Sequence, residues 1–527
     1  MKKMYIGMLL ALLLPTGFVA CSDDGVPEKA PTQVTPPSEE DPKEEPEPES
    51  PEVTAETEMN EVIDACLSEL YLWNGEYNGM TRDLTIPYVD GYENFMRTTL
   101  LSMTTNTLDK KRNSAGGYNL YSYIEREEKK TGSRNVRAGG VDNGIEKEDK
   151  IKSYGFCWMH GVNFINTGSV GLVVQSVYPD SPASAMGVKR GTYIFKVNGT
   201  TIDQSNYASL ALSLLAPQAQ TVTLTVNDGN GARKDVTLMA AEIDPSPVLL
   251  NTVIEEGSHK IGYLVYDAFD AAYDNELLDV VTELKSAGVT DLVLDLRYNG
   301  GGHVNSSMML TACIVGSQCR DKLYMYYRYN DTRMRQVEKT KRDTGNGYDP
   351  EAKYFYENFM YDDYFGVNLA DYALGLERVY TLVTSSSASA SEVLINVLRG
   401  LDFPVEVIGG KTNGKNVGME VVKFDKGDYT YELAPITFQY YNAKRETILA
   451  NGLKVDYEVS DWDDGYIDFG ERNEPLLSKA IELITGQSSS SSLSRSVAGV
   501  PLRILPVGEA LDGGHHPRGT LVLRKDR

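Results

Sequence analysis

The most informative stretch of the chain is residues 291–302, which read DLVLDLRYNGGG. Its first six residues are mostly Leu and Val, and this composition is typical of a short strand buried on both faces. Three glycines end the stretch, so a turn is expected directly after the strand, and a helix is expected near 304–315. Strand, turn and helix in this order predict one unit of an α/β layer.

A second stretch repeats this order further along the chain. Residues 379–384 are expected to form a buried strand, and SSSASASE at 385–392 leads into a helix over 391–400. Further elements are expected on both sides: strands at 260–265, 405–409 and 430–441, and a helix at 274–287. Because ligands in open α/β sheets bind at the carboxyl ends of strands, both small-residue turns are expected to line one crevice.

The second turn offers the parts of a nucleophilic site. A serine at the start of a helix has backbone N–H groups beside it, at the positive end of the helix dipole. A glycine-rich turn lets a second amide approach the same point, which suits a developing oxyanion. The serine also needs a base. His303 follows the glycine turn, and the other route is a lysine whose pKa must fall by roughly 3 through burial.

Three motifs in sequence order carry a family resemblance: LDLRYNGGG at 294–302, SASASE at 387–392, and the pair Gly414 and Lys415. Together they resemble the carboxyl-terminal processing (tail-specific) serine protease family, over roughly residues 54–485. The resemblance implies a mixed α/β multidomain protein with a protease core of the ClpP/crotonase-like type. It implies serine-type hydrolysis of peptide bonds by a Ser-Lys dyad, with no cofactor and no metal.

The resemblance also implies the roles of four residues. The middle serine of SASASE, Ser389, is the expected nucleophile, and Lys415 is the expected base. The backbone amides of Ala390 and of the glycine turn, at Gly301, are expected to form the oxyanion hole.

One position departs from the family pattern. The family has a Gln four residues after the lysine, where it orients the lysine, and this chain has Met419. Methionine cannot donate a hydrogen bond. Asn416 is a substitute that spacing alone does not establish, and Glu420 is expected to point to the other face of a strand. Two alternatives therefore stay open: a catalytically inert peptide-binding lipoprotein, and a serine hydrolase that uses His303 as its base.

Residues 151–245 predict a β-rich module. The string from Pro179 to Gly199 resembles a PDZ domain, in which peptide C-termini bind by strand addition and backbone amides hold the carboxylate. The resemblance places the carboxylate-binding loop at Tyr154, Gly155, Phe156 and Cys157. The expected partners are therefore polypeptides with accessible C-termini.

The N-terminal residues predict export and anchoring. Residues 1–20 have a basic start and an apolar stretch, as in a secretory signal peptide, and Val-Ala-Cys ending at Cys21 resembles a bacterial lipobox. Lipid on Cys21 would anchor the protein in the cell envelope, at the periplasmic face or the cell surface of the outer membrane. The acidic, Pro-rich residues to 53 are expected to form a disordered tether.

Composition sets the remaining limits. The 527 residues carry a net charge of −24, which argues against a nucleic-acid partner. Five Cys exclude a disulfide-stapled scaffold, although Cys313 and Cys319 are either a pair or two apolar thiols. The expected organisation is completed by a helical unit at 54–150, the protease core at 246–486, and a low-complexity linker and tail at 487–527. The sequence does not predict the oligomeric state.

Overall fold

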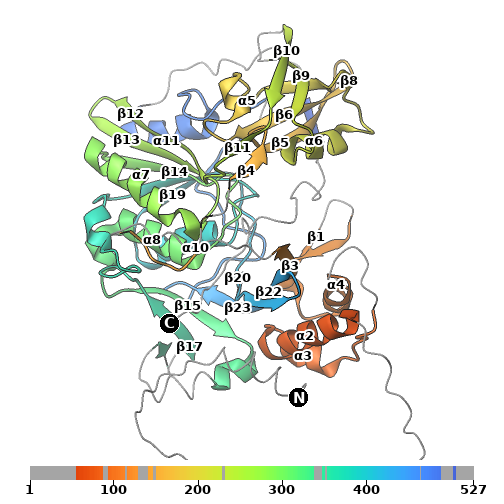
Figure 1. Cartoon of the computed structure of the whole chain (residues 1–527). Helices are drawn as coiled ribbons and strands as arrows, with labels where there is room; N and C mark the ends of the chain where they lie inside the picture. Colours follow the sequence, from red (N-terminus) through yellow and green to blue (C-terminus); the bar gives the residue numbers. More distant parts are fainter. Residues whose placement is uncertain are drawn as a thin grey trace, which may run out of the picture.

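The protein is described here from a computed structural model, shown in Figure 1. The structure describes residues 55–86, 93–112, 116–128, 140–145, 147, 150–227, 232–336, 347–349, 353–462, 465–487 and 502–505. The predicted signal peptide, Cys21, the tether and most of the predicted C-terminal linker and tail lie outside these residues. No helix within them is long and apolar enough to cross a membrane.

A six-stranded sheet forms the centre of the α/β core. Its order is β12 (Val248–Glu256), β13 (His259–Tyr266), β14 (Asp291–Asp295), β18 (Val379–Val383), β19 (Val405–Gly409) and β24 (Tyr457–Glu458). The strands from β13 to β24 are parallel, and only β12 at the edge is antiparallel to its neighbour. The carboxyl ends of β14 and β18 are adjacent, so the two turns that follow them start side by side.

Helices cover both faces of this sheet. On one face lie α7 (Asp274–Ala287), α8 (Val304–Val315) and α10 (Ala390–Gly400), and on the other lies α11 (Pro475–Thr485). Side chains alternate along β14, since Leu292 and Leu294 pack with the first group whereas Val293 packs with α11. The predicted helices at 274–287 and 304–315 are confirmed. Cys313 and Cys319 are buried free thiols.

The tyrosine-rich segment after α8 forms strands. An antiparallel sheet has the order β16 (Tyr348–Asp349), β17 (Tyr354–Asn358), β15 (Leu323–Tyr329), β23 (Ile436–Tyr441) and β20 (Val417–Met419). Its aromatic rings pack on one another, as Tyr329 does against Phe355 and Phe438. This sheet fixes β20, which follows directly after Lys415.

The N-terminal helices share an apolar core with strands from the C-terminal half of the chain. Helices α2 (Ala55–Leu70), α3 (Asn74–Gly79) and α4 (Glu93–Ser102) pack over a sheet of β21 (Val422–Lys426), β22 (Tyr429–Ala434) and β3 (Tyr123–Glu128). Strand β3 comes from the N-terminal unit and pairs with β22. Ile63 and Phe95 share one apolar cluster with Met419 and Leu433. The N-terminal unit is therefore continuous with the elements around Lys415.

The β-rich module is a separate sheet with its own apolar core. Its order is β10 (Arg233–Met239), β9 (Thr221–Asn227), β7 (Tyr193–Val197), β6 (Ser169–Val177), β5 (Phe156–Phe164) and β25 (Leu502–Leu505). Helices α5 (Pro182–Ala185) and α6 (Tyr207–Leu215) complete it. Figure 1 shows this module above the α/β core and the N-terminal helices below it. The edge strand β25 comes from the C-terminal segment.

A buried ion cluster joins the β-rich module to the glycine turn. Arg297, at the start of the turn, pairs with Asp295, with Glu474 at 2.6 Å and with Asp461 at 2.6 Å. Arg190 of the β-rich module pairs with the same Asp461 at 2.8 Å. Both arginines are buried, and desolvation of the cluster is offset because each guanidinium is bonded to several acceptors. Asp295 and Arg297 thus form a buried ion pair at the start of the glycine turn.

We expect Arg297→Met to lower the free energy of unfolding by about 3–5 kcal/mol, because Asp295 and Glu474 would lose their buried arginine and Asp461 would keep only Arg190. The control is Arg399→Met, which breaks a half-exposed pair with Asp456 and should cost less than about 1 kcal/mol. Urea denaturation of both variants measures the difference. Equal losses would show that the buried cluster contributes no more than a surface pair.

Candidate active site

The glycine turn and the serine turn lie against each other. Ala388 N–H donates to Asn299 O at 3.1 Å, and Ser391 Oγ donates to the same carbonyl at 2.9 Å. A Cβ on Gly301 would come within 2.6 Å of the Ser389 Cβ, so only glycine permits this approach. The predicted meeting of the two turns at one edge of the sheet is therefore present in the structure.

Ser389 has a strained backbone directly before α10. Its φ is +57° and its ψ is −115°, a conformation that L-residues with a side chain rarely adopt. The residue is buried, and its Oγ atom has no hydrogen-bond partner. Strain and an unsatisfied hydroxyl both cost stability, and such features gather at functional sites. The hydroxyl is thus held ready at the start of a helix.

The two predicted oxyanion donors differ in their present contacts. Ala390 is the first residue of α10, so its N–H has no acceptor within the helix. The Ala390 nitrogen lies 2.9 Å from the position that a Cβ on Gly301 would occupy. The Gly301 N–H instead donates to the Asn299 side chain at 2.9 Å. Gly301 can serve as a second donor only after its amide leaves Asn299.

Glu392 ties the serine turn to the lysine loop. One of its carboxylate oxygens accepts from the backbone N–H of Ser389 at 2.9 Å and from that of Lys415 at 3.0 Å. These two nitrogens are therefore no more than about 6 Å apart. The other oxygen accepts from Thr412 Oγ1 at 2.6 Å and from Gly414 N–H at 2.7 Å. Burial raises the pKa of Glu392, while these four donors lower it.

A local sequence pattern predicts the contact of Glu392 with the backbone of Ser389. Ser389-Ala390-Ser391-Glu392 has the S-x-x-E spacing in which a third-position Glu accepts from the backbone before the helix. The structure shows this bond, and the carboxylate additionally reaches Lys415.

Lys415 is a buried lysine with a strongly lowered pKa. Its side chain is buried, and desolvation brings its pKa from 10.5 down to about 7. This value already includes the opposing effect of the Asp109 and Glu392 carboxylates, which raise the pKa, and the charge of Lys111, which lowers it. Near neutral pH a large fraction of the amine is thus uncharged and able to accept a proton.

Tyr121 of the N-terminal unit covers the lysine amine. The Lys415 Nζ atom lies 4.7 Å from the centre of the Tyr121 ring. The ring is held by Tyr121 OH donating to Asn413 Oδ1 at 2.7 Å and by Tyr121 N–H donating to Asp109. Asp109 is itself buried and accepts from Tyr71 OH of the same unit at 2.6 Å. No local sequence pattern marks Tyr121, because its partner lies far along the chain.

The residues around the missing Gln all have other contacts. Met419 is fully buried in the apolar cluster beneath the N-terminal helices. Asn416 donates to Ile448 O at 2.8 Å. Glu420 forms a buried pair with Arg333, with a 2.8 Å bond from Nη2. The ring of Tyr121, from a different part of the chain, lies over the lysine amine.

His303 faces a different segment from the serine. It stands before α8, and its Nδ1 lies 3.2 Å from Phe269 O and 3.3 Å from Ala271 N. Because Ser389 Oγ has no hydrogen-bond partner, neither His303 nor Lys415 is bonded to it in this structure. Catalytic hydrogen bonds in sites without substrate are often long and tighten on binding.

The predicted carboxylate-binding loop lies at the start of β5. Tyr154 is buried, with its hydroxyl donating to Ala219 O at 2.8 Å. Gly155 has φ +105°, and its N–H donates to Ser153 Oγ at 2.9 Å. Phe156 is the first residue of β5, and the half-buried Cys157 lies at an irregularity in the pairing of β5 with β6. The loop thus leads directly into β5, so a peptide held by the loop could pair with the edge of that strand.

Comparisons with known proteins match this fold and site. Residues 260–459 match the family model described as "Peptidase family S41". A "Carboxyl-terminal-processing protease" of Picosynechococcus sp. is 22% identical over 60% of this chain and 68% of its own length. A "Probable CtpA-like serine protease" of Staphylococcus aureus is 26% identical over 49% of this chain and 44% of its own length.

A solved structure gives the same fold. The crystal structure described as a "Putative S41 protease" from Bacteroides fragilis superposes with a TM-score of 0.57 and 24% identity. It covers 80% of this chain and 97% of that chain. Fold, site and relatives together define a serine-type peptidase. Residues 260–459 are thus similar to Peptidase family S41, and the curated relatives that match the chain are carboxyl-terminal-processing and CtpA-like serine proteases.

The backbone of Ser389 leads to a stability prediction. We expect Ser389→Gly to be about 1 kcal/mol more stable than Ser389→Ala, because glycine relieves the positive φ. The matched control is Ser391, a residue of α10, where Gly should be less stable than Ala by about 1 kcal/mol. Thermal unfolding of the four variants measures both differences. The same sign at both positions would contradict strain at Ser389.

Proposed function

We propose that the chain is a serine endopeptidase in which Ser389 is the nucleophile and neutral Lys415 is its base. The observation that carries the proposal is the buried Lys415 amine, whose pKa is about 7. The backbone N–H groups of Lys415 and Ser389 donate to the same Glu392 oxygen, which keeps the two residues close together. A base is most useful when its pKa lies near the working pH. Polypeptides are the substrates that the family implies.

In the first step the Ser389 Oγ attacks a peptide carbonyl. The Lys415 amine takes the hydroxyl proton as the bond to carbon forms, which requires the two side chains to come within hydrogen-bond distance when substrate binds. The carbonyl oxygen gains negative charge and accepts from the Ala390 N–H, at the positive end of α10. A second donor at Gly301 would add a similar contribution once it is released from Asn299.

In the second step the protonated Lys415 returns its proton to the leaving amine, and the acyl group stays on Ser389. Water then attacks the ester, with Lys415 again accepting a proton and Ser389 leaving as the alcohol. Tyr121 and the N-terminal unit keep water from the amine, so the same residue can act as base and acid near neutral pH. The lysine has support although Met419 replaces the Gln. The Tyr121 ring lies over its amine, and Glu392 accepts from its backbone N–H.

We further propose that the β-rich module captures substrate C-termini. The continuity of the Tyr154–Cys157 loop with β5 supports a peptide added as a strand along that edge. The sequence around Cys21 supports a lipid anchor in the cell envelope, with residues to 53 acting as the tether. Release of the chain from the membrane by cleavage in that tether should leave a soluble, active protein.

We expect Ser389→Ala and Lys415→Ala to each reduce cleavage by at least about a thousandfold, because each removes one partner of the dyad. The substrate is a folded protein with an unstructured C-terminal extension, and cleavage is measured as kcat/KM. His303→Ala is the matched control and should keep most of the activity. Loss of activity in His303→Ala with normal activity in Lys415→Ala would assign the base to the histidine.

The burial of Lys415 predicts the pH dependence. The value of kcat/KM should rise with pH around a midpoint of about 7, since only the neutral amine is a base. We expect Tyr121→Ala to move this midpoint upward by about one pH unit, because water would reach the amine and favour its charged form.

Two further variants separate shielding from other effects. Tyr121→Phe keeps the ring and should keep the midpoint, although it loses the bond to Asn413. Tyr118→Ala removes an exposed tyrosine of the same unit and should leave the profile unchanged. An unchanged midpoint in Tyr121→Ala would show that the ring does not control the lysine pKa.

A further inference from the structure

A strand from the C-terminal segment, β25, pairs with the edge of β5 that β6 leaves open. The four residues of β25 pair antiparallel with β5, with Leu502 opposite Phe164 and Leu505 opposite Gly161. Strand β5 is the strand that follows the predicted carboxylate-binding loop, and β6 occupies its other edge. The edge that a peptide would need for strand addition is therefore already paired within this chain.

The direction of β25 is that of a bound C-terminal peptide. Since β25 is antiparallel to β5, its chain runs from the Phe164 end toward the Phe156 end, where the Gly155 loop lies. A peptide whose carboxylate is held by that loop would enter along the same edge in the same direction. Strand β25 thus has the direction of such a ligand, and it pairs with residues 161–164, the part of β5 that is farther from the loop.

Leu505 packs in the apolar core of the β-rich module. It is buried and belongs to the apolar cluster of the β-rich module, against which Tyr207 of α6 packs. A Cβ on Gly161 would lie 2.5 Å from the Tyr207 ring and 3.1 Å from the Leu505 Cβ. The absence of a side chain at Gly161 therefore leaves room for Tyr207 and Leu505 side by side, between β5 and α6.

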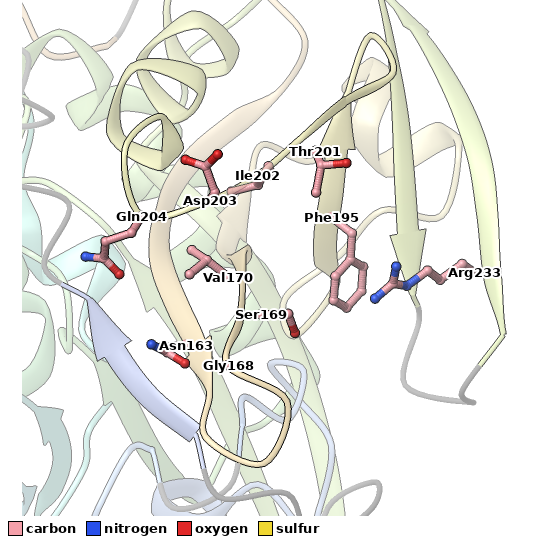
Figure 2. A pocket seen from close by; sticks show the side chains of 10 residues that line it. All are labelled: Asn163, Gly168, Ser169, Val170, Phe195, Thr201, Ile202, Asp203, Gln204 and Arg233. Atoms are coloured by element: carbon pink, nitrogen blue, oxygen red, sulfur yellow. The ribbon is translucent and has the colours of Figure 1, made fainter.

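The groove continues past β25. A pocket of about 500 Å³ borders Asn163, whose strand partner is Arg503 of β25, and it extends to residues 201–204 just before α6 (Figure 2). Figure 2 shows the blue strand β25 beside Asn163, with Arg233 and Asp203 on the far side of the pocket. The upstream residues of a substrate that runs along β5 in the direction of β25 have space here.

We propose that β25 is a built-in competitor that occupies the substrate groove of the β-rich module until a polypeptide C-terminus displaces it. The proposal rests on the proposed function of the module in peptide capture. It also defines the substrate class: the displacing segment carries an aliphatic residue at the position of Leu505, opposite Gly161. A tethered strand competes at an effective concentration of about millimolar, so only peptides of useful affinity and abundance displace it.

The test measures peptide binding without cleavage. In the full chain with Ser389→Ala, the probe is a fluorescein-labelled VPLRILPVGEA peptide, the sequence of residues 500–510, with a free carboxylate. Its length is set by the register, because Leu505 pairs with Gly161 and about five more residues are needed to reach the loop before Phe156. We expect Leu505→Gln to bind this probe about tenfold more tightly than the parent in fluorescence anisotropy, because the buried amide weakens the tethered strand. Arg503→Gln introduces the same residue at an exposed position of β25 and should bind as the parent does.

Amide hydrogen exchange over residues 156–164 gives a second readout. It should be faster in Leu505→Gln than in the parent, and the probe should slow it again. Equal probe affinity in the parent and in Leu505→Gln would overturn occupancy by β25 while leaving peptide capture intact. Faster exchange with no probe binding by any variant would make β25 a structural edge strand and overturn peptide capture as well. Neither the anisotropy nor the hydrogen-exchange result depends on Ser389 or Lys415 being catalytic.

Discussion

The desolvation of one amine is the constraint on which the rest of the site depends. The pKa of Lys415 is about 7 in the folded chain and near 10.5 when exposed, so folding releases a proton between these values. The sign follows from linkage: the folded state binds fewer protons in this window, and stability rises as the pH rises from 7 toward 10.5. Below pH 7 the buried charge costs as much as about 5 kcal/mol. The fold must supply that free energy elsewhere.

The contacts that offset this cost come from parts of the chain that are distant in sequence. The N-terminal helices share an apolar cluster with β20 and β22, and they place Tyr121 over the amine through the buried carboxylate of Asp109. Glu392 then fixes the backbone of Lys415 to that of Ser389. The helices before the β-rich module are thus part of the environment of the Lys415 amine, and a chain that lacked them would expose the lysine to water.

The sequence predicted the elements whose pattern is local. Helices 274–287 and 304–315 and the strands around them follow from apolar periodicity, and Ser389 and Lys415 follow from motif order. The contacts that tune these residues are long-range, so periodicity carries no trace of Tyr121 or Asp109. The engagement of the Gly301 amide by Asn299 depends on side-chain rotation that a glycine motif does not specify. Strand β25 is four residues long, too short for its alternation to separate it from a linker.

The β-rich module is joined to the glycine turn by contacts that start from its own sheet. Strand β6 pairs with β5, and Arg190 donates to Gln175 O on β6 at 3.0 Å. The same guanidinium bonds Tyr298 of the glycine turn at 2.8 Å and Asp461, which also holds Arg297. The path from the outer edge of β5 to the glycine turn therefore runs through β5, β6 and the buried side chain of Arg190. Desolvated ion pairs of this kind have few alternative geometries, because any carboxylate that leaves its guanidinium stays buried. The cluster accordingly holds the glycine turn in one register with the module, whichever strand lies on β5.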